Sequence, residues 1–387
     1  MSVEKTINRG NLKQRESGIE MLKIFAIGLI VISHVINSLC KENVYIGYND
    51  YIVDLSHATT SISNFFIILM MYFGVLGNSL FFICSAWFLL DSKKCSGKKI
   101  MNMLTDIWVI SILIMVVMII ILGRESISYK LIIKSIFPTT FANNWYLTAY
   151  ILFYMIHGLL NKLILGMSQQ QLLMSASVLG FLYICCDFIK GDLFFSSILI
   201  LWVAIYFIIA YLKYYCPKLC ENKKVNMILF IVGILGNITI VLLTNMLGLK
   251  ISFFNDKVLH WKVNYNPFII MVAVSSFNLA RNCHKKNSTI NKIAKCSLLI
   301  YIIHENLLLR TYIRPYIWKL IYNNFGYSNL FFWTMLFSII LFGVALLLSL
   351  FYQKTIQYFT FKLSSIFFEL ISKVYKYYER FMLKTYR

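Results

Sequence analysis

Lys23 and His34 are ionisable side chains within a largely apolar stretch, residues 19–39. They are 11 positions apart, close to three turns of an α-helix, so both lie on nearly one face, about 16 Å apart along the axis. Ionisable groups inside an apolar helix are costly and tend to mark function. A histidine in such surroundings tends to stay neutral, as a general base must be. Lys23, nearer the helix start, either serves an anionic substrate or only reaches the membrane surface.

A second pair of ionisable residues, His304 and Glu305, lies in another apolar stretch, residues 294–313. Neighbours on a helix point about 100° apart, so we expect that the two side chains cannot face one spot. Tyr301 and Glu305, four residues apart, share a side. We expect His304 to meet His34 in a shared cavity, and its replacement to be more damaging than Glu305→Gln. A polar cluster that only holds helices together is the alternative.

The composition predicts an integral membrane protein. Of the 387 residues, 59% are hydrophobic and 14% are charged, with a mean hydropathy of +0.71. Apolar blocks near 20 residues long can cross a bilayer as helices, which satisfy their own backbone hydrogen bonds. We therefore predict an all-α, polytopic fold with about ten transmembrane helices. Their expected ranges are 19–39, 62–90, 101–122, 143–161, 170–186, 192–212, 226–248, 265–281, 294–313 and 328–352.

Loop charges predict the orientation. With the N-terminus inside, cytoplasmic segments hold 25 of the 37 Lys and Arg residues and outer loops hold 11, which favours cytoplasmic N- and C-termini in a multi-pass protein of the plasma membrane. We divide the chain into a cytoplasmic lead (1–18), a transmembrane domain (19–352) and a basic amphipathic cytoplasmic tail (353–387). The net charge of +21 indicates contact with membrane lipid and not with nucleic acid. The nine cysteines lack metal-ligand spacing, so we predict no metal site.

Several segments resemble acyltransferase family 3. A basic residue, ten intervening residues and a histidine, as in Lys23 to His34, resemble its first-helix signature. The family commonly has Arg at the first of these positions. Four other segments look similar: GNSLFFICSAWFLL (77–90), NNWYLTAYILFYMIHGLLN (143–161), YNPFII (265–270) and YIIHEN (301–306). Departures from the pattern are Ala86 in place of Gly and Gly158 in place of Pro.

The resemblance implies a membrane-bound O-acyltransferase, with acetyl-CoA or another acyl-CoA as the cytoplasmic donor substrate. The acceptor would be a hydroxyl of an envelope polysaccharide or a lipid-linked sugar. By this resemblance His34 is the general base or carries the acyl group, His304 and Glu305 share the catalytic site, and Lys23 binds the donor. The alternatives are a transporter or flippase of a lipid-linked sugar, which would use the same ionisable groups as a path, and a structural or sensory subunit.

The same resemblance suggests residues that line the substrate cavity. They come from three of the predicted helices and are Asn78, Ser85, Trp145, Tyr150 and Tyr301. For the small polar members, hydrogen bonding between helices is an equally good interpretation.

Overall fold

The computed structural model describes residues 17–39, 53, 55–92, 95–190, 197–326 and 329–385. Most of the predicted lead (1–18) and the last two residues of the predicted tail therefore lie outside the described residues. Within these ranges the regular secondary structure is entirely helical, so the predicted all-α class is confirmed. Eight of the described helices are long and apolar enough to span a membrane. They are Ser17–Leu39, Ile62–Leu89, Gly97–Leu122, Trp145–Gly166, Gln169–Ile189, Ile198–Tyr215, Lys223–Gly248 and Leu330–Thr355.

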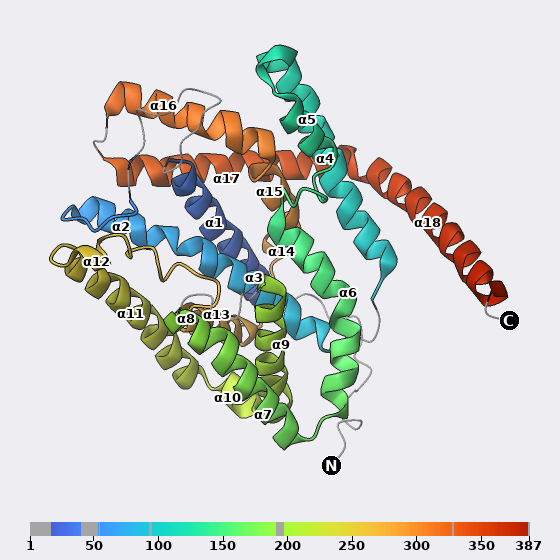
Figure 1. The fold of residues 1–387 in the computed structure, drawn as a ribbon, viewed down its shortest axis with the longest axis horizontal. Helices are drawn as coiled ribbons and strands as arrows, with labels where there is room; N and C mark the ends of the chain where they lie inside the picture. Colours follow the sequence, from blue (N-terminus) through green and yellow to red (C-terminus); the bar gives the residue numbers. More distant parts are fainter. Residues whose placement is uncertain are drawn as a thin grey trace.

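The elements follow one another in a chain of long and short helices (Figure 1). In order they are α1 Ser17–Leu39, α2 Ile62–Met71, α3 Phe73–Leu89, α4 Gly97–Leu122, η3 Arg124–Ser126, α5 Tyr129–Ile136, α6 Trp145–Gly166, α7 Gln169–Gly180, η4 Phe181–Cys186, α8 Asp187–Lys190, α9 Ile198–Tyr215, α10 Pro217–Glu221, α11 Lys223–Gly248, α12 Ser252–Asn255, α13 Pro267–Arg281, α14 Ser288–Ala294, α15 Ser297–His304, η5 Leu309–Ile313, α16 Arg314–Phe325, α17 Leu330–Thr355 and α18 Gln357–Thr385.

Two of the ten predicted transmembrane helices are not among these eight spans. The eighth, α13, is a shorter apolar helix of 15 residues. The ninth, expected to be continuous over 294–313, is divided among α14, α15 and η5. The interruption within it falls at Glu305 and Asn306, whose polar side chains form part of the site described below.

Helix α1 lies at the centre of the packing, where it contacts α3, α13, α17 and several shorter helices. Two glycines allow α3 to approach α1 closely. A Cβ at Gly74 would lie 2.6 Å from the Ser33 hydroxyl, and one at Gly77 would lie 2.6 Å from the Ala26 carbonyl oxygen. The Ser33 hydroxyl also donates to the Met71 carbonyl. These contacts fix the depth and rotation of α1, and with them the position of His34.

The second predicted helix is divided at Tyr72, between α2 and α3. The Tyr72 hydroxyl donates to the Val258 carbonyl at 2.9 Å.

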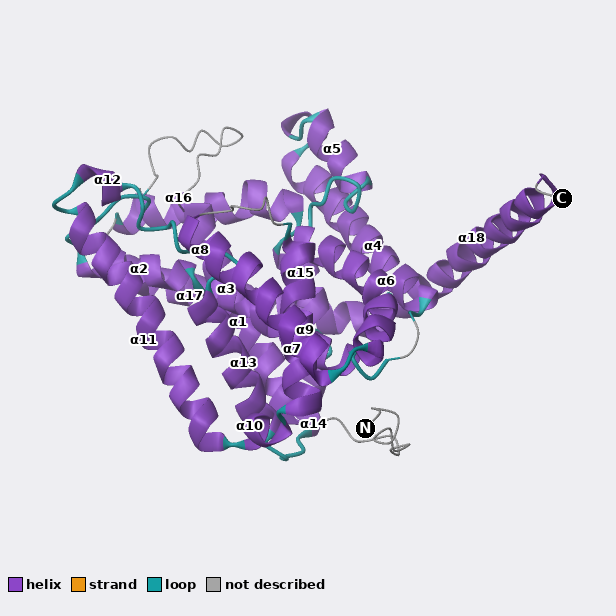
Figure 2. Ribbon diagram, turned by 60° about the horizontal axis from the view of Figure 1, so that its bottom comes forward, coloured by secondary structure: helices purple, strands orange, loops and turns teal. Residues whose placement is uncertain are grey.

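At the other end of the chain, α17 is followed by α18, which projects sideways from the helical body in both views (Figures 1 and 2). Its first turns pack against α4.

Candidate active site

His304 and Glu305 reach the same point because the helix that carries them ends there. α15 ends at His304, and Glu305 follows as its C-cap, outside the regular helix. The Asn306 side chain then accepts a hydrogen bond from the Leu308 amide at 3.0 Å and so caps the next helical segment. The prediction that the two side chains could not face one spot is wrong, since it assumed a continuous helix.

Glu305 is the centre of the cluster that forms around His34. Its Oε2 lies 2.9 Å from His34 Nδ1 and 3.0 Å from Arg314 Nη2. Its Oε1 lies 2.9 Å from Arg310 Nη1. His304 Nε2 completes the group at 3.1 Å from His34 Nδ1. The two histidines therefore meet in the structure, as expected. Glu305 connects His34 to the two arginines.

The hydrogen-bond network assigns the proton positions on the two imidazoles. His304 Nδ1 lies 2.7 Å from the Ile300 carbonyl, which can only accept, so this nitrogen carries the proton. In the neutral ring His304 Nε2 is then an acceptor. His34 Nδ1 faces this acceptor and the Glu305 carboxylate, so it is the donor. The lone pair of His34 consequently lies on Nε2, on the other side of its ring.

Access distinguishes the two histidines. The His34 side chain is 18% exposed, whereas His304 is 1% exposed. A substrate hydroxyl can therefore approach His34 more readily. The geometry favours His34 as the group that exchanges a proton with substrate, and His304 as a buried partner that orients it.

Arg310 and Arg314 were not singled out by the sequence analysis. A π-helical segment, η5, leads into α16, and Pro315 at the start of α16 explains it, because proline cannot donate the usual backbone hydrogen bond to the preceding turn. The wider turn brings both guanidinium groups to Glu305. Two arginines four residues apart, the first of them five residues after Glu305, are the sequence signal that could have identified them.

Helix α16 also holds the backbone of α1 at the site. Arg314 Nη1 donates to the His34 carbonyl at 3.2 Å, and Trp318 Nε1 donates to the Val35 carbonyl at 3.0 Å. Arg314 is only 4% exposed. A buried guanidinium needs a compensating charge, and Glu305 supplies it. Arg314 thus joins the Glu305 carboxylate to the backbone of α1 at His34.

Of the five residues predicted to line a substrate cavity, Tyr301 contacts the histidine cluster, with its ring centroid 5.9 Å from that of His304. The Tyr301 ring also contacts the Tyr146 ring, with centroids 6.0 Å apart. The Tyr146 hydroxyl donates to the backbone carbonyl of Asn78, and Trp145 packs edge-on against Tyr146. Tyr146 was missed by the sequence analysis, although it lies beside Trp145 in the same aromatic group.

The other predicted residues are Ser85, Tyr150, which lies one turn after Tyr146 on α6, and Lys23. Ser85 pairs with Tyr150 through their side chains, and Tyr150 stacks on Tyr154. Lys23 does not touch the histidine cluster. Its Nζ lies 3.1 Å from a carboxylate oxygen of Glu20, one turn away, and its side chain is 25% exposed.

The ligand atoms of His34, His304 and Glu305 all lie within 4.8 Å of one another, which is close enough to hold a metal ion. Both Glu305 oxygens, however, are already bound by guanidinium groups, and His34 Nδ1 would have to lose its proton. A divalent cation placed there would be repelled by Arg310 and Arg314 at short range. The cluster is thus better arranged for proton transfer than for metal binding.

Residues 16–352 match a protein-family model described as an acyltransferase domain. No curated protein and no solved structure matches the chain.

Proposed function

The chain belongs to the acyltransferase 3 family, whose model covers residues 16–352, and from this premise we propose that it moves an acetyl group from cytoplasmic acetyl-CoA to a hydroxyl of an envelope glycan. The protein is a multi-pass membrane acyltransferase. Acetyl-CoA as the donor, a glycan or lipid-linked sugar as the acceptor, and cytoplasmic termini in the plasma membrane are parts of the proposal. The observation that carries it is the contact of His34 with Glu305 and His304.

In the proposed reaction, His34 Nε2 accepts the proton of the acceptor hydroxyl. The hydroxyl oxygen attacks the thioester carbonyl, the carbon–sulfur bond breaks, and the coenzyme A thiolate leaves with the proton returned from His34. Glu305, held by Arg310 and Arg314, keeps the imidazole in the tautomer that this step requires and stabilises its charged form. With both histidines neutral, the cluster has a formal charge of +1, which favours the negative charge that develops on the thioester oxygen.

The reaction can be tested in isolated membranes that contain the protein. We expect label to pass from radioactive acetyl-CoA to the glycan fraction, and membranes without the protein to transfer none. Because the guanidinium groups occupy the carboxylate, EDTA should leave the rate unchanged. A rate that EDTA abolishes and zinc restores would instead support a metal bound by the two histidines and Glu305. A sugar flux without acetyl transfer would support the transporter.

Lys23 is proposed to bind the anionic part of the donor. It lies three turns before His34 on α1, about 16 Å away along the axis, and its side chain keeps partial exposure beside Glu20. We expect Lys23→Ala to raise the KM for acetyl-CoA by about tenfold, equivalent to one charge-assisted contact of ~1.4 kcal/mol. Lys23→Arg, which keeps the charge, should raise it less. Equal KM values for the two variants would leave Lys23 as a residue that only reaches the membrane surface.

A further inference from the structure

Helix α18 is amphipathic, and its apolar face is covered along only part of its length. Near its start, Phe367 packs against Trp108 of α4 with ring centroids 6.3 Å apart. Phe368 lies so close to Gly97 that a Cβ there would come within 2.8 Å of its ring. Beyond this crossing the helix leaves the body (Figures 1 and 2).

The apolar face continues past the point where α4 stops covering it. Ile371, Val374 and Tyr375 follow Phe367 and Phe368 at helical spacing, so they share the same side. They are 56%, 69% and 66% exposed. Apolar surface of this kind beside a membrane-spanning body needs a cover.

The opposite face is basic. Lys362, Lys373 and Lys376 are exposed and lie on the side of α18 away from Phe367. Residues 353–387 contain seven Lys and Arg residues and two Glu residues. An apolar face with lysines opposite is the pattern of a helix that lies in the interface of a membrane with acidic lipid.

Hydrogen bonds to α4 fix the position at which α18 is attached to the rest of the protein. Asp106 of α4 accepts a hydrogen bond from Tyr352 at 2.8 Å, and the Tyr352 hydroxyl also contacts Thr360. One turn earlier on α4, Asn102 accepts from Ser364 at 2.6 Å. These buried polar contacts fix the first turns of α18 across the first three turns of α4, near the end of a membrane-spanning helix. A helix that leaves the body sideways from this level runs along the membrane surface.

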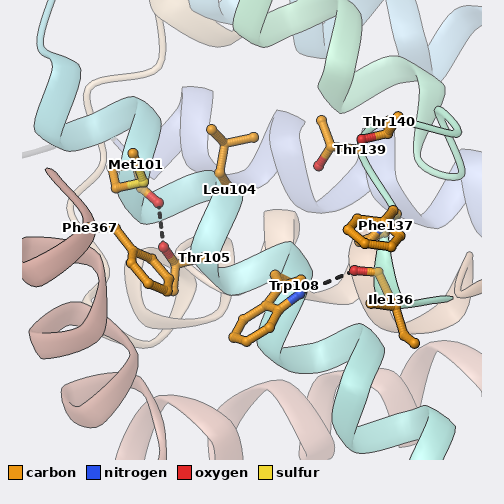
Figure 3. A pocket seen from close by; sticks show the side chains of 10 residues that line it. Met101, Leu104, Thr105, Trp108, Ile136, Phe137, Thr139, Thr140 and Phe367 are labelled. Carbon is orange, nitrogen blue, oxygen red and sulfur yellow. Dashed lines mark hydrogen bonds between the residues drawn. The ribbon is translucent and has the colours of Figure 1, made fainter. Parts of the chain in front are cut away.

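A pocket opens beside this crossing (Figure 3). It has a volume of about 270 Å³ and is bounded by α4, by the segment that follows α5 and by Phe367 of α18. Most of its lining is apolar, and Thr139 and Thr140 lie together at one side. A pocket of this character suits part of a lipid acyl chain.

We propose that α18 is a docking surface for acidic phospholipid, with Ile371, Val374 and Tyr375 in the hydrocarbon boundary and the three lysines at the head groups. Because Gly97 marks the cytoplasmic end of α4 in the proposed orientation, the lipid is that of the inner leaflet. None of the residues named above for the acyl-transfer site belongs to α18, so the surface is independent of that site.

The test uses the full chain in vesicles of phosphatidylcholine, with or without phosphatidylglycerol. A fluorescent amino acid is inserted at Val374 or, as the matched control, at Lys373, and quenching by spin-labelled lipid is measured. We expect the probe at Val374 to be blue-shifted and quenched several times more than the one at Lys373. Phosphatidylglycerol should increase the difference, and high salt should reverse that increase.

A variant with Gln at positions 362, 373 and 376 should lose the part of the quenching at Val374 that depends on phosphatidylglycerol, because each lysine contributes about fivefold to partition onto an acidic surface. These side chains are exposed, so folding should be unaffected. Equal, weak quenching at the two probe positions would place the helix in water and overturn the proposal. Cross-links between α18 helices of two copies would also overturn it, since a second chain would then cover the face.

Discussion

Replacing His34 with alanine should lower the rate of acyl transfer by ~10²–10⁴, the usual loss when a general base is removed. The side chain is partly exposed and lies at the edge of the cluster, so a smaller residue should leave membrane insertion intact. His34→Gln keeps much of the volume but cannot take up a proton, and we expect it to fail nearly as badly. The measurement is transfer of label from radioactive acetyl-CoA to glycan at matched protein levels.

His57→Ala is the matched control, since His57 is an exposed histidine outside the cluster and its loss should leave the rate unchanged. If His34→Ala transfers acetyl at the wild-type rate, His34 is not the base. If the protein is a transporter, the wild-type protein should show no turnover of acetyl-CoA at all.

The general architecture could be predicted from the sequence because hydrocarbon imposes so simple a rule. Long apolar runs must be helices, so the all-α class and most of the spans follow from hydropathy alone. The position of His34 in α1 and its expected contact with His304 also followed, since ionisable residues are costly in apolar stretches and tend to mark function.

The part that could not be predicted depends on where a helix stops. Glu305 was expected to point away from His304, and the break after α15 brings both to one place. The arginines were missed for a related reason, because Arg314 reaches Glu305 only after a π-helical turn that Pro315 induces. If one regular helix is assumed across this segment, Glu305, Arg310 and Arg314 are all assigned to the wrong face.

The geometry also changes which residue we expect to matter most after His34. From the sequence, Glu305→Gln was expected to be less damaging than loss of His304. In the structure Glu305 contacts His34 and both arginines, whereas the hydrogen bonds of His304 go to Nδ1 of His34 and to the Ile300 carbonyl of its own helix. We now expect the reverse order.

Glu305→Gln should lower kcat by ~10²–10⁴, because an amide cannot stabilise the charged imidazole and holds its tautomer poorly. The KM for acetyl-CoA should change little, since Glu305 is proposed to act through His34 and not on the donor. Glu305→Asp keeps the charge with a shorter reach and should recover part of kcat. Transfer kinetics over a range of acetyl-CoA concentrations separate the two constants.

Stability must be measured alongside, because the substitution leaves Arg314 buried without its carboxylate, which commonly costs about 3–5 kcal/mol. Thermal unfolding in detergent reports this cost. Arg314→Gln breaks the same buried pair and should lower stability to a similar degree, whereas Arg310→Gln, at a guanidinium 31% exposed, should have a small effect. Glu125→Gln, an exposed change outside the cluster, serves as the matched control. If Glu305→Gln lowers stability while the folded fraction keeps the wild-type kcat, the carboxylate holds the helices together and takes no part in positioning His34.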